Sequence, residues 1–493
     1  MARLTARRTL ASAALALAAT LPAGPTRADV AVSPVAVWVA VAAGGTPTPP
    51  GKSAATSPQS EGANVPAAPT VVYDLPRILA LTDRNHPNLA ASRARVLQAR
   101  AQLDEAHLAP FSQFKLTGGF ALAPTVQGNN VFSPNTDVSL TSSLAVAWQG
   151  GIQGVVPLWT FGKITNLWDA AAAGVHVSEA DLERERDVLR VDVRKAYFGL
   201  QLARDSTLLL KDVRSAIDKA IAAMEKQIAK DEGDPIDLLR IQTYGAELDV
   251  REAEAHKYVE VALAGLRFYT GVIDLDIPDV PIRPPKHELG HVTRYLSAAS
   301  LYRPEIAMAR AGVSARTAQV HLARSQFFPD IGLALSVGMS AAPAVADQIN
   351  PYVVDPGNYF HYGAAFVFQW KLDFPAQAAR LRFAEAQLEE VRAQQRFALG
   401  GVGTEVEVAY AEVIDWKKRA EAYSRAVKTA KRWMVMVQEG IDIGTLAEKE
   451  LLDPAKAYAT NKFSQLNAVM ELDMAMSRLA RATGWDAIAP DGT

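Results

Sequence analysis

Residues 359–374 read YFHYGAAFVFQWKLDF, and apolar side chains occupy every second position of this stretch. A period of two with one apolar and one small or polar face predicts a β-strand that lies between two different environments. The stretch of 16 residues exceeds the ~5–6 residues usual for strands of soluble sandwiches and the ~9–11 residues that cross a bilayer. We therefore interpret it as a transmembrane strand. Its apolar face carries Phe360, Tyr362, Ala364, Phe366, Phe368, Trp370, Leu372 and Phe374.

Three further stretches alternate in the same way, within residues 114–122, 140–158 and 331–339. Four strands are too few to close a barrel, and open strand edges are not tolerated in lipid. Several copies of the chain are therefore expected to share one β-barrel.

Long helical segments accompany the strands. Apolar residues recur in alternating steps of four and three between Val402 and Ile441, and the same pattern runs from Leu189 to Ile228, where only Thr207 and Arg214 interrupt it. A strict seven-residue repeat predicts a left-handed coiled coil. We expect one helix from Ile164 to about Lys230, a length of ~100 Å. A second helix should then return in each case, and in the first case Asp234 can cap it with Pro235 at its first position.

The sequence contains an internal duplication. Ala196-Tyr197 matches Ala409-Tyr410, Asp237-Leu238-Leu239 matches Glu450-Leu451-Leu452, and Thr270-Gly271 matches Thr483-Gly484, all at an offset of 213 positions. Asn85-His86-Pro87 likewise corresponds to Tyr302-Arg303-Pro304, and each precedes an Ala-rich helical stretch. We expect a first structural repeat over 71–285, a second over 286–486 and a short tail over 487–493.

The composition excludes several classes of partner and site. The 51 Lys and Arg balance 53 Asp and Glu to a net charge of -2, so no field favours a nucleic-acid partner. The absence of cysteine excludes disulfides, thiolate metal sites and a lipid on an N-terminal cysteine.

The N-terminus carries an export signal. Arg3, Arg7 and Arg8 precede an apolar stretch over 10–21, the order found in secretory signal peptides. We expect residues 1–28 to be the signal peptide, with cleavage as late as 42–43, and 29–70 to be a flexible leader rich in Pro and Ala. The mature chain is thus expected to be an α+β membrane protein, in which each repeat joins two long strands to long antiparallel coiled-coil helices.

The order of these features resembles the TolC-like outer-membrane efflux proteins over residues 75–486. That order is Asn-His-Pro-x-Leu at 85–89, an Ala-rich helix, two strands, a long helix with Ala-Tyr, then Asp-Leu-Leu and a closing Thr-Gly, all duplicated. The resemblance implies a homotrimer in the outer membrane of a Gram-negative bacterium. Three chains would give four strands each to one barrel, continued by an α-helical tunnel in the periplasm.

The resemblance also implies a function and partners. The protein would be a passive channel without cofactor or catalytic activity, within a tripartite efflux or type I secretion system. Its partners would be outer-membrane lipid, a periplasmic adaptor and an inner-membrane RND pump or ABC transporter.

The family's acidic tip constriction falls on Glu450 and Asp453, two carboxylates three residues apart just after the turn that ends the second long helix. Three copies would form a negative ring that favours cations. Pro454 follows Asp453 directly, which also allows Asp453 to be a helix cap. The adaptor is expected to contact the helix-tip turns at Gly233, Asp234, Gly440 and Gly444.

One motif indicates a different function. His287-Glu288-Leu289-Gly290-His291 is an H-E-x-x-H sequence, which on a helix would place His287 and His291 on zinc with Glu288 as general base of a secreted metallopeptidase. Pro281, Pro284 and Pro285 crowd its approach and argue against a helix there. A periplasmic coiled-coil scaffold without a barrel is the other alternative.

Overall fold

The computed structural model describes residues 71–111, 113–127, 139–230, 234–343, 345, 352, 355 and 357–491. The chain divides into two units, residues 1–66 and 67–493, and all that follows concerns the second unit. The signal peptide and leader expected over 1–70 lie outside the described residues, as do the last two residues of the expected tail.

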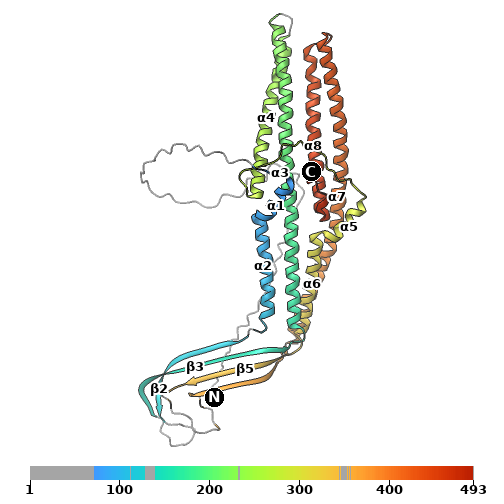
Figure 1. Ribbon diagram of the computed structural model, residues 1–493. Coiled ribbons are helices and arrows are strands. Elements are labelled where there is room, and N and C mark those ends of the chain that lie inside the picture. The colour runs from blue at the N-terminus through green and yellow to red at the C-terminus, as the bar shows by residue number, and fades with distance from the viewer. Residues whose placement is uncertain are drawn as a thin grey trace, which may run out of the picture. The chain divides into compact units, whose positions relative to one another are not determined.

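Four strands form one antiparallel sheet in the order β2-β3-β5-β6 (Figure 1). They are β2 (Lys115–Gln127), β3 (Ser139–Trp159), β5 (Asp330–Ala341) and β6 (Tyr359–Gln369). The register places apolar residues side by side on one face, with Ile152 opposite Val337 and Val337 opposite Tyr362. The other face holds small and polar residues, such as Ser340 between Gln149 and Tyr359. The alternation expected from the sequence is therefore continuous across the sheet, and the apolar face is exposed in the single chain, with Tyr362 78% exposed.

The last strand is shorter than expected, because it ends at Gln369 instead of Phe374. Its neighbour β5 begins at Asp330, directly opposite Gln369, and the preceding Pro329 has no N–H for a ladder. Beyond this point the Trp370 indole N–H donates to the Phe327 carbonyl at 3.0 Å, and the chain enters a helix at Phe374.

The long helices confirm the heptad interpretation. α3 (Lys163–Ile228) has 66 residues and α7 (Phe374–Asp442) has 69, which corresponds to ~100 Å each. They return as α4 (Pro235–Thr270) and α8 (Leu452–Thr483). Asp234 caps α4 as expected, since its side chain accepts a hydrogen bond from the Ile236 N–H at 2.8 Å. None of the described helices is both long and apolar enough to cross a membrane.

Shorter elements complete each repeat. α1 (Leu75–Asn85) and α2 (Pro87–Leu108) precede β2, while α5 (Val292–Tyr302) and α6 (Pro304–Ser325) precede β5. The order helix, helix, strand, strand, long helix, return helix thus occurs twice. The remaining elements are the paired strands β1 (Val71–Val72) and β4 (Leu275–Asp276), and the 3-10 helices η1 (Glu448–Leu451) and η2 (Asp486–Ile488).

The two repeats pack unequally. α3 packs against α2 and α4 of its own repeat, and also against α6 and α8 of the other repeat. α7 packs against α5, α6 and α8, and in the part of the chain that the structure describes it has no comparable packing against α2 or α4. α3 is therefore central in the single chain, whereas α7 has one side without a partner.

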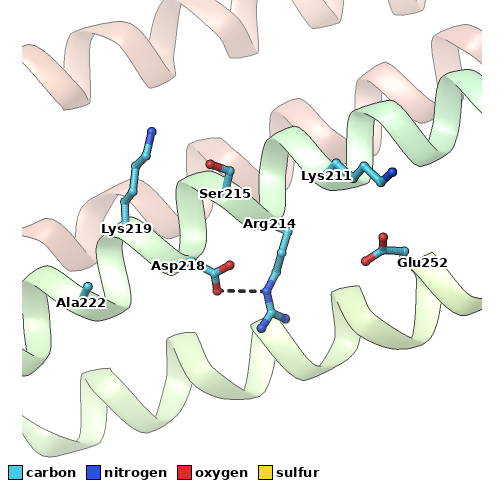
Figure 2. Close-up of a pocket in the computed structure, with 7 residues that line it drawn as sticks. All are labelled: Lys211, Arg214, Ser215, Asp218, Lys219, Ala222 and Glu252. Atoms are coloured by element: carbon cyan, nitrogen blue, oxygen red, sulfur yellow. Dashed lines mark hydrogen bonds and ion pairs between the residues drawn. The ribbon is translucent and has the colours of Figure 1, made fainter.

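Arg214 interrupts the apolar seam of α3 for a structural reason. Its guanidinium crosses to α4, where it donates to the Gly245 carbonyl at 2.6 Å and to Asp249 Oδ1 at 2.5 Å. It also binds Asp218 of its own helix at 3.0 Å, and Figure 2 shows it in the pocket between the two helices. A side chain at Gly245 would approach the guanidinium to 3.4 Å, so the arginine and the glycine fit together.

Each return helix ends at a glycine in the left-handed region. Gly271 follows α4 with φ 70° and Gly484 follows α8 with φ 66°. The two positions differ in their surroundings. A Cβ at Gly484 would lie 2.6 Å from the Tyr302 carbonyl oxygen, whereas a Cβ at Gly271 would meet only the Asn85 side chain, at 3.8 Å. The second repeat is therefore packed more tightly at this joint.

This difference predicts unequal effects of the same substitution. Gly271→Ala and Gly484→Ala each incur the left-handed backbone penalty of about 1–2 kcal/mol. Gly484→Ala should lose about 1–3 kcal/mol more, because the backbone of α5 must move. The free energy of unfolding of both variants, measured in detergent, tests this. Equal losses would contradict the close approach at Gly484.

Candidate constriction at the helix tips

The turn after α7 is built around two glycines. Gly444 has φ 78°, and the N–H groups of Thr445 and Leu446 both donate to the Gly440 carbonyl, at 2.9 and 3.1 Å. The Leu446 side chain covers Gly440 so closely that a Cβ there would lie 2.6 Å from it. Gly440 is therefore buried and offers no surface to a partner, unlike Gly444, which is exposed.

The acidic residues after this turn fall into two environments. Glu448 is half-buried, and burial raises the pKa of its carboxyl group. Lys449 turns toward the first repeat, where its Nζ lies 3.2 Å from Oδ2 of Asp237, a side chain only 11% exposed. Glu450 and Asp453 are exposed, and neither forms an ion pair with another described residue. Lys449, which directly precedes Glu450, is thus bound to Asp237, and these two carboxylates have no ion-pair partner among the described residues.

Glu450 belongs to η1, and Asp453 lies in the first turn of α8. The N-cap of α8 is Leu451, so the interpretation of Asp453 as a cap is wrong. The 3-10 turn moves the start of the helix forward, so that Pro454 lies in its first turn, where no backbone N–H is required.

The helix tips expose apolar side chains beside the turn residues. Ile236 is 67% exposed next to Asp234, and Ile443 is 75% exposed next to Gly444. Gly233 lies outside the described residues. Of the turn residues expected to contact an adaptor, Asp234 and Gly444 are therefore placed at accessible tips.

The H-E-x-x-H sequence is not helical. It lies in the connection before α5, and His291 is the N-cap of that helix, where its Nδ1 accepts from the Thr293 N–H at 3.4 Å. His287 Nε2 lies 3.0 Å from the Tyr295 hydroxyl, and burial, with the nearby Arg294, lowers the pKa of its imidazole. The described residues contain no group of three His, Asp or Glu side chains arranged to hold a metal ion. The zinc-site interpretation therefore has no geometric basis here.

Comparison with known proteins gives the family. A family model described as outer membrane efflux protein matches residues 79–272 and 295–485. The chain belongs to the outer membrane efflux protein family. It is 21% identical over 373 residues to the probable outer membrane lipoprotein SilC of Salmonella typhimurium, covering 73% of each chain. It is 23% identical over 428 residues to the solvent efflux pump outer membrane protein SrpC of Pseudomonas putida, covering 80% of this chain and 83% of that protein.

Solved structures share the fold. The outer membrane channel MtrE of Neisseria gonorrhoeae superposes with a TM-score of 0.68 at 18% identity, covering 83% of this chain and 89% of that one. Together these matches confirm the family resemblance, the α+β fold class and the outer-membrane location with a large periplasmic portion. The strands of the described sheet do not fit the alternative of a coiled-coil scaffold.

In this family member, a charged cluster that the sequence did not indicate joins the C-terminal segment to the first repeat. Arg194 of α3 is 1% exposed and binds Asp486 at 2.7 Å and Asp491 at 3.1 Å. Arg190 binds Asp486 and Asp83 of α1, each at 3.0 Å. Burial raises the pKa of the neighbouring Asp187 to about 6. Arg190 and Arg194 lie in a stretch of α3 rich in charged residues, so nothing local distinguished them, and their shared partner Asp486 lies almost 300 positions further along the chain.

Asp473 of α8 is a second buried group that sequence reasoning missed. It is 1% exposed, and neither of its carboxyl oxygens has a hydrogen-bond partner among the described residues. Burial raises its pKa to about 8. The side chain is therefore protonated in the folded chain at neutral pH.

Asp473 predicts a specific pH dependence of stability. The unfolded chain releases this proton near the ordinary aspartate pKa of about 3.9, whereas the folded chain retains it up to about 8. The free energy of unfolding should therefore fall as pH rises from about 4 to about 8. Asp473→Asn should reduce this slope and stabilise the chain at pH 7 by about 1–3 kcal/mol. Asp453→Asn, an exposed aspartate of the same helix, is the control, and an equal effect of both substitutions would refute the assignment.

Proposed function

We propose that the protein is the outer-membrane channel of a tripartite efflux or type I secretion system. It exports substrates passively, after an inner-membrane pump has delivered them through a periplasmic adaptor. The observation that carries this proposal is that, among the described residues, α3 and β3 of the first repeat contact α8 and β5 of the second, whereas their counterparts α7 and β6 make no comparable contacts with α4 and β2. A second copy can make each of them.

The sheet is the simplest case. The first repeat meets the second through β3 and β5, the last strand of one repeat and the first strand of the next. The equivalent contact would join β6 to β2, but these strands are the two edges of the sheet. Pairing β6 of one copy with β2 of the next repeats the observed contact and removes both edges from lipid.

The helices follow the same rule. α3 packs across the repeats against α8, so α7 should pack against α4 of a second copy. Leu452 and Met474 of α8 are 7% and 3% exposed in the single chain. Their counterparts in α4, at the offset of 213, are Leu239 and Val261, and both are 62% exposed. The second copy would cover these two side chains as α3 covers the α8 pair.

Contacts of this head-to-tail kind close into a ring. Two copies would supply eight strands, and a barrel of about eight strands is filled by its own side chains. Three copies are the smallest number that leaves a passage, in agreement with the homotrimer that the family resemblance implies. The small and polar face of the sheet, with Gln149 and Ser340, would line this passage.

At the other end, Glu450 and Asp453 would form a negative constriction. Both are exposed, and Lys449, the cation that directly precedes Glu450, is bound to Asp237. Threefold repetition would concentrate negative potential at the tips. The exposed Ile236 and Ile443, beside Asp234 and Gly444, would contact the adaptor.

Assembly is testable at α4. Leu239→Lys and Val261→Lys should each abolish the trimer, because a lysine would be buried without a partner in the interface, while the helical content of the chain stays unchanged. Light scattering of the detergent-solubilised protein measures the assembly. Val250→Lys is the matched control, since Val250 is also 62% exposed on α4 but its counterpart Phe463 is exposed as well. A trimer that persists in both test variants would refute the proposed contact.

The constriction is testable by conductance. Glu450→Ala combined with Asp453→Ala should raise the single-channel conductance in planar bilayers by about twofold and reduce the preference for cations. Glu439→Ala combined with Asp442→Ala removes the same charge from the end of α7 and should change neither property. Unchanged conductance in the first variant would remove these residues from the constriction. A protein that forms no channel at all would refute the proposed function.

A further inference from the structure

One face of α7 concentrates positive charge. Six exposed cations, together called the basic face, lie within residues 417–432, a length of about 22 Å along the helix. Glu421 is the only acid among them. None of the six side chains forms an ion pair or a hydrogen bond with another described residue. The six are Lys417, Lys418, Arg425, Lys428, Lys431 and Arg432.

The neighbouring Arg419 is not part of this face. Its guanidinium binds Asp415 at 2.9 Å and lies over the Trp416 ring. Its charge is therefore compensated within the helix, whereas the charges of the basic face are not.

The basic face points away from both packing surfaces of α7. The buried seam of the helix contains Val413, Ala430 and Val437. The surface proposed above for the next copy contains Trp433, whose counterpart Ala220 is buried in α3. At the coiled-coil period of 3.5 residues per turn, the centre of the basic face lies roughly 130° around the helix from each of these surfaces. The face thus stays open to solvent in the assembled ring.

The fold does not require positive charge at all six positions, because the first repeat has an acidic or neutral residue at four of them and a cation, Arg204 or Lys219, only at the other two. Lys418, Arg425 and Lys431 correspond at the offset of 213 to Asp205, Asp212 and Asp218. In the first repeat Asp205 accepts a hydrogen bond from the Ile282 N–H at 2.8 Å, and Asp218 pairs with Arg214 (Figure 2). The same segment therefore carries mixed and paired charges in one repeat, and uniform, unpaired charges in the other.

We propose that the basic face of α7 is a docking surface for an acidic α-helical segment of a protein partner. Lys418, Arg425 and Arg432 follow one another at intervals of seven residues, about 10.5 Å along the helix. A partner helix with acidic residues in each heptad repeats its charges at the same interval and can pair with all three at once. The straight row of charges matches such a helix laid alongside α7.

The proposal rests on the proposed function, because it is the periplasmic adaptor that would supply this helix beside the distal half of α7. The docking proposal adds that this contact is electrostatic, between cations of α7 and acidic residues of the partner helix. Complementary charge speeds association and selects the partner, and binding should weaken as salt screens the exposed charges.

A synthetic peptide tests the proposal on the full-length assembled protein. The probe is a fluorescein-labelled four-heptad helix with two adjacent glutamates in each heptad, and the matched probe has glutamine at those positions. Fluorescence anisotropy should show at least about tenfold tighter binding of the glutamate peptide, and a loss of affinity at high salt.

The variant Lys418→Glu, Arg425→Glu, Arg432→Glu should weaken binding of the glutamate peptide by about tenfold or more. Arg380→Glu, Arg382→Glu, Arg396→Glu makes the same charge change at exposed positions of the same helix and should bind like the wild type. If the reversed-charge variant does not assemble, the Lys418→Gln, Arg425→Gln, Arg432→Gln variant should still show a severalfold loss.

Three results would overturn the proposal. The first is that the wild type does not bind the glutamate peptide. The second is that both triple variants lose the same affinity for it. The third is that the wild type binds isolated peptidoglycan and not the peptide. Planar-bilayer conductance of the same preparations distinguishes failure of the docking proposal from failure of the proposed function. A wild type that conducts but does not bind the peptide refutes the docking surface alone, whereas one that binds but does not conduct refutes the channel alone.

Discussion

A β-strand edge cannot be left open in a bilayer, because no water is present to bond its free N–H and C=O groups. The described sheet of this outer-membrane protein begins at β2 and ends at β6, and both have an unpaired side. The single chain is therefore incomplete in its membrane part. In the proposed assembly the same chain supplies the missing strand neighbours, and the number of copies follows from the need for an open passage.

Duplication lets one interface serve twice. In the proposed ring, the contacts that the first repeat makes with the second inside the chain would recur between copies, so the ring would need no separate set of interface residues. As a consequence, equivalent residues of the two repeats have different surroundings within one chain. Leu452 is buried where Leu239 is exposed, and Gly484 is tightly enclosed where Gly271 is not. His86 and Arg303 are the corresponding N-cap residues of α2 and α6. Arg303 pairs with Glu305, whereas burial lowers the pKa of His86.

Unequal surroundings also allow the repeats to diverge in charge. α3 is enclosed by four helices, and several of its charged residues bind other segments of the chain, as Arg214 binds Gly245 and Arg194 binds Asp486. α7 has more free surface and carries the basic face. At the tip, Lys449 joins the second repeat to Asp237 of the first, so a contact between repeats determines which acidic residues are left without a counter-ion.

Much of the fold could be predicted because it is periodic. Alternation with a period of two located the strands, the heptad located the long helices, and the offset of 213 located the duplication, since each pattern reflects a face that must be apolar at every turn. The strand end at Gln369 was missed, because it depends on where the neighbouring strand begins. The sequence left open whether Asp453 is a helix cap or lies inside the helix, because the answer depends on a 3-10 turn of four residues that precedes the helix.

The sequence by itself determined the two faces of each strand, the seams of the helices and the order of elements, because these are local repeats that a residue expresses without its distant neighbours. Only the tertiary structure decided which charges are paired. The partners of Arg194, Lys449 and Arg214 come from other helices or from the C-terminal segment. It also showed that the H-E-x-x-H motif caps a helix instead of forming one. Such pairings depend on which segments the packing brings within about 3 Å. A periodic sequence pattern does not indicate which distant segments will meet.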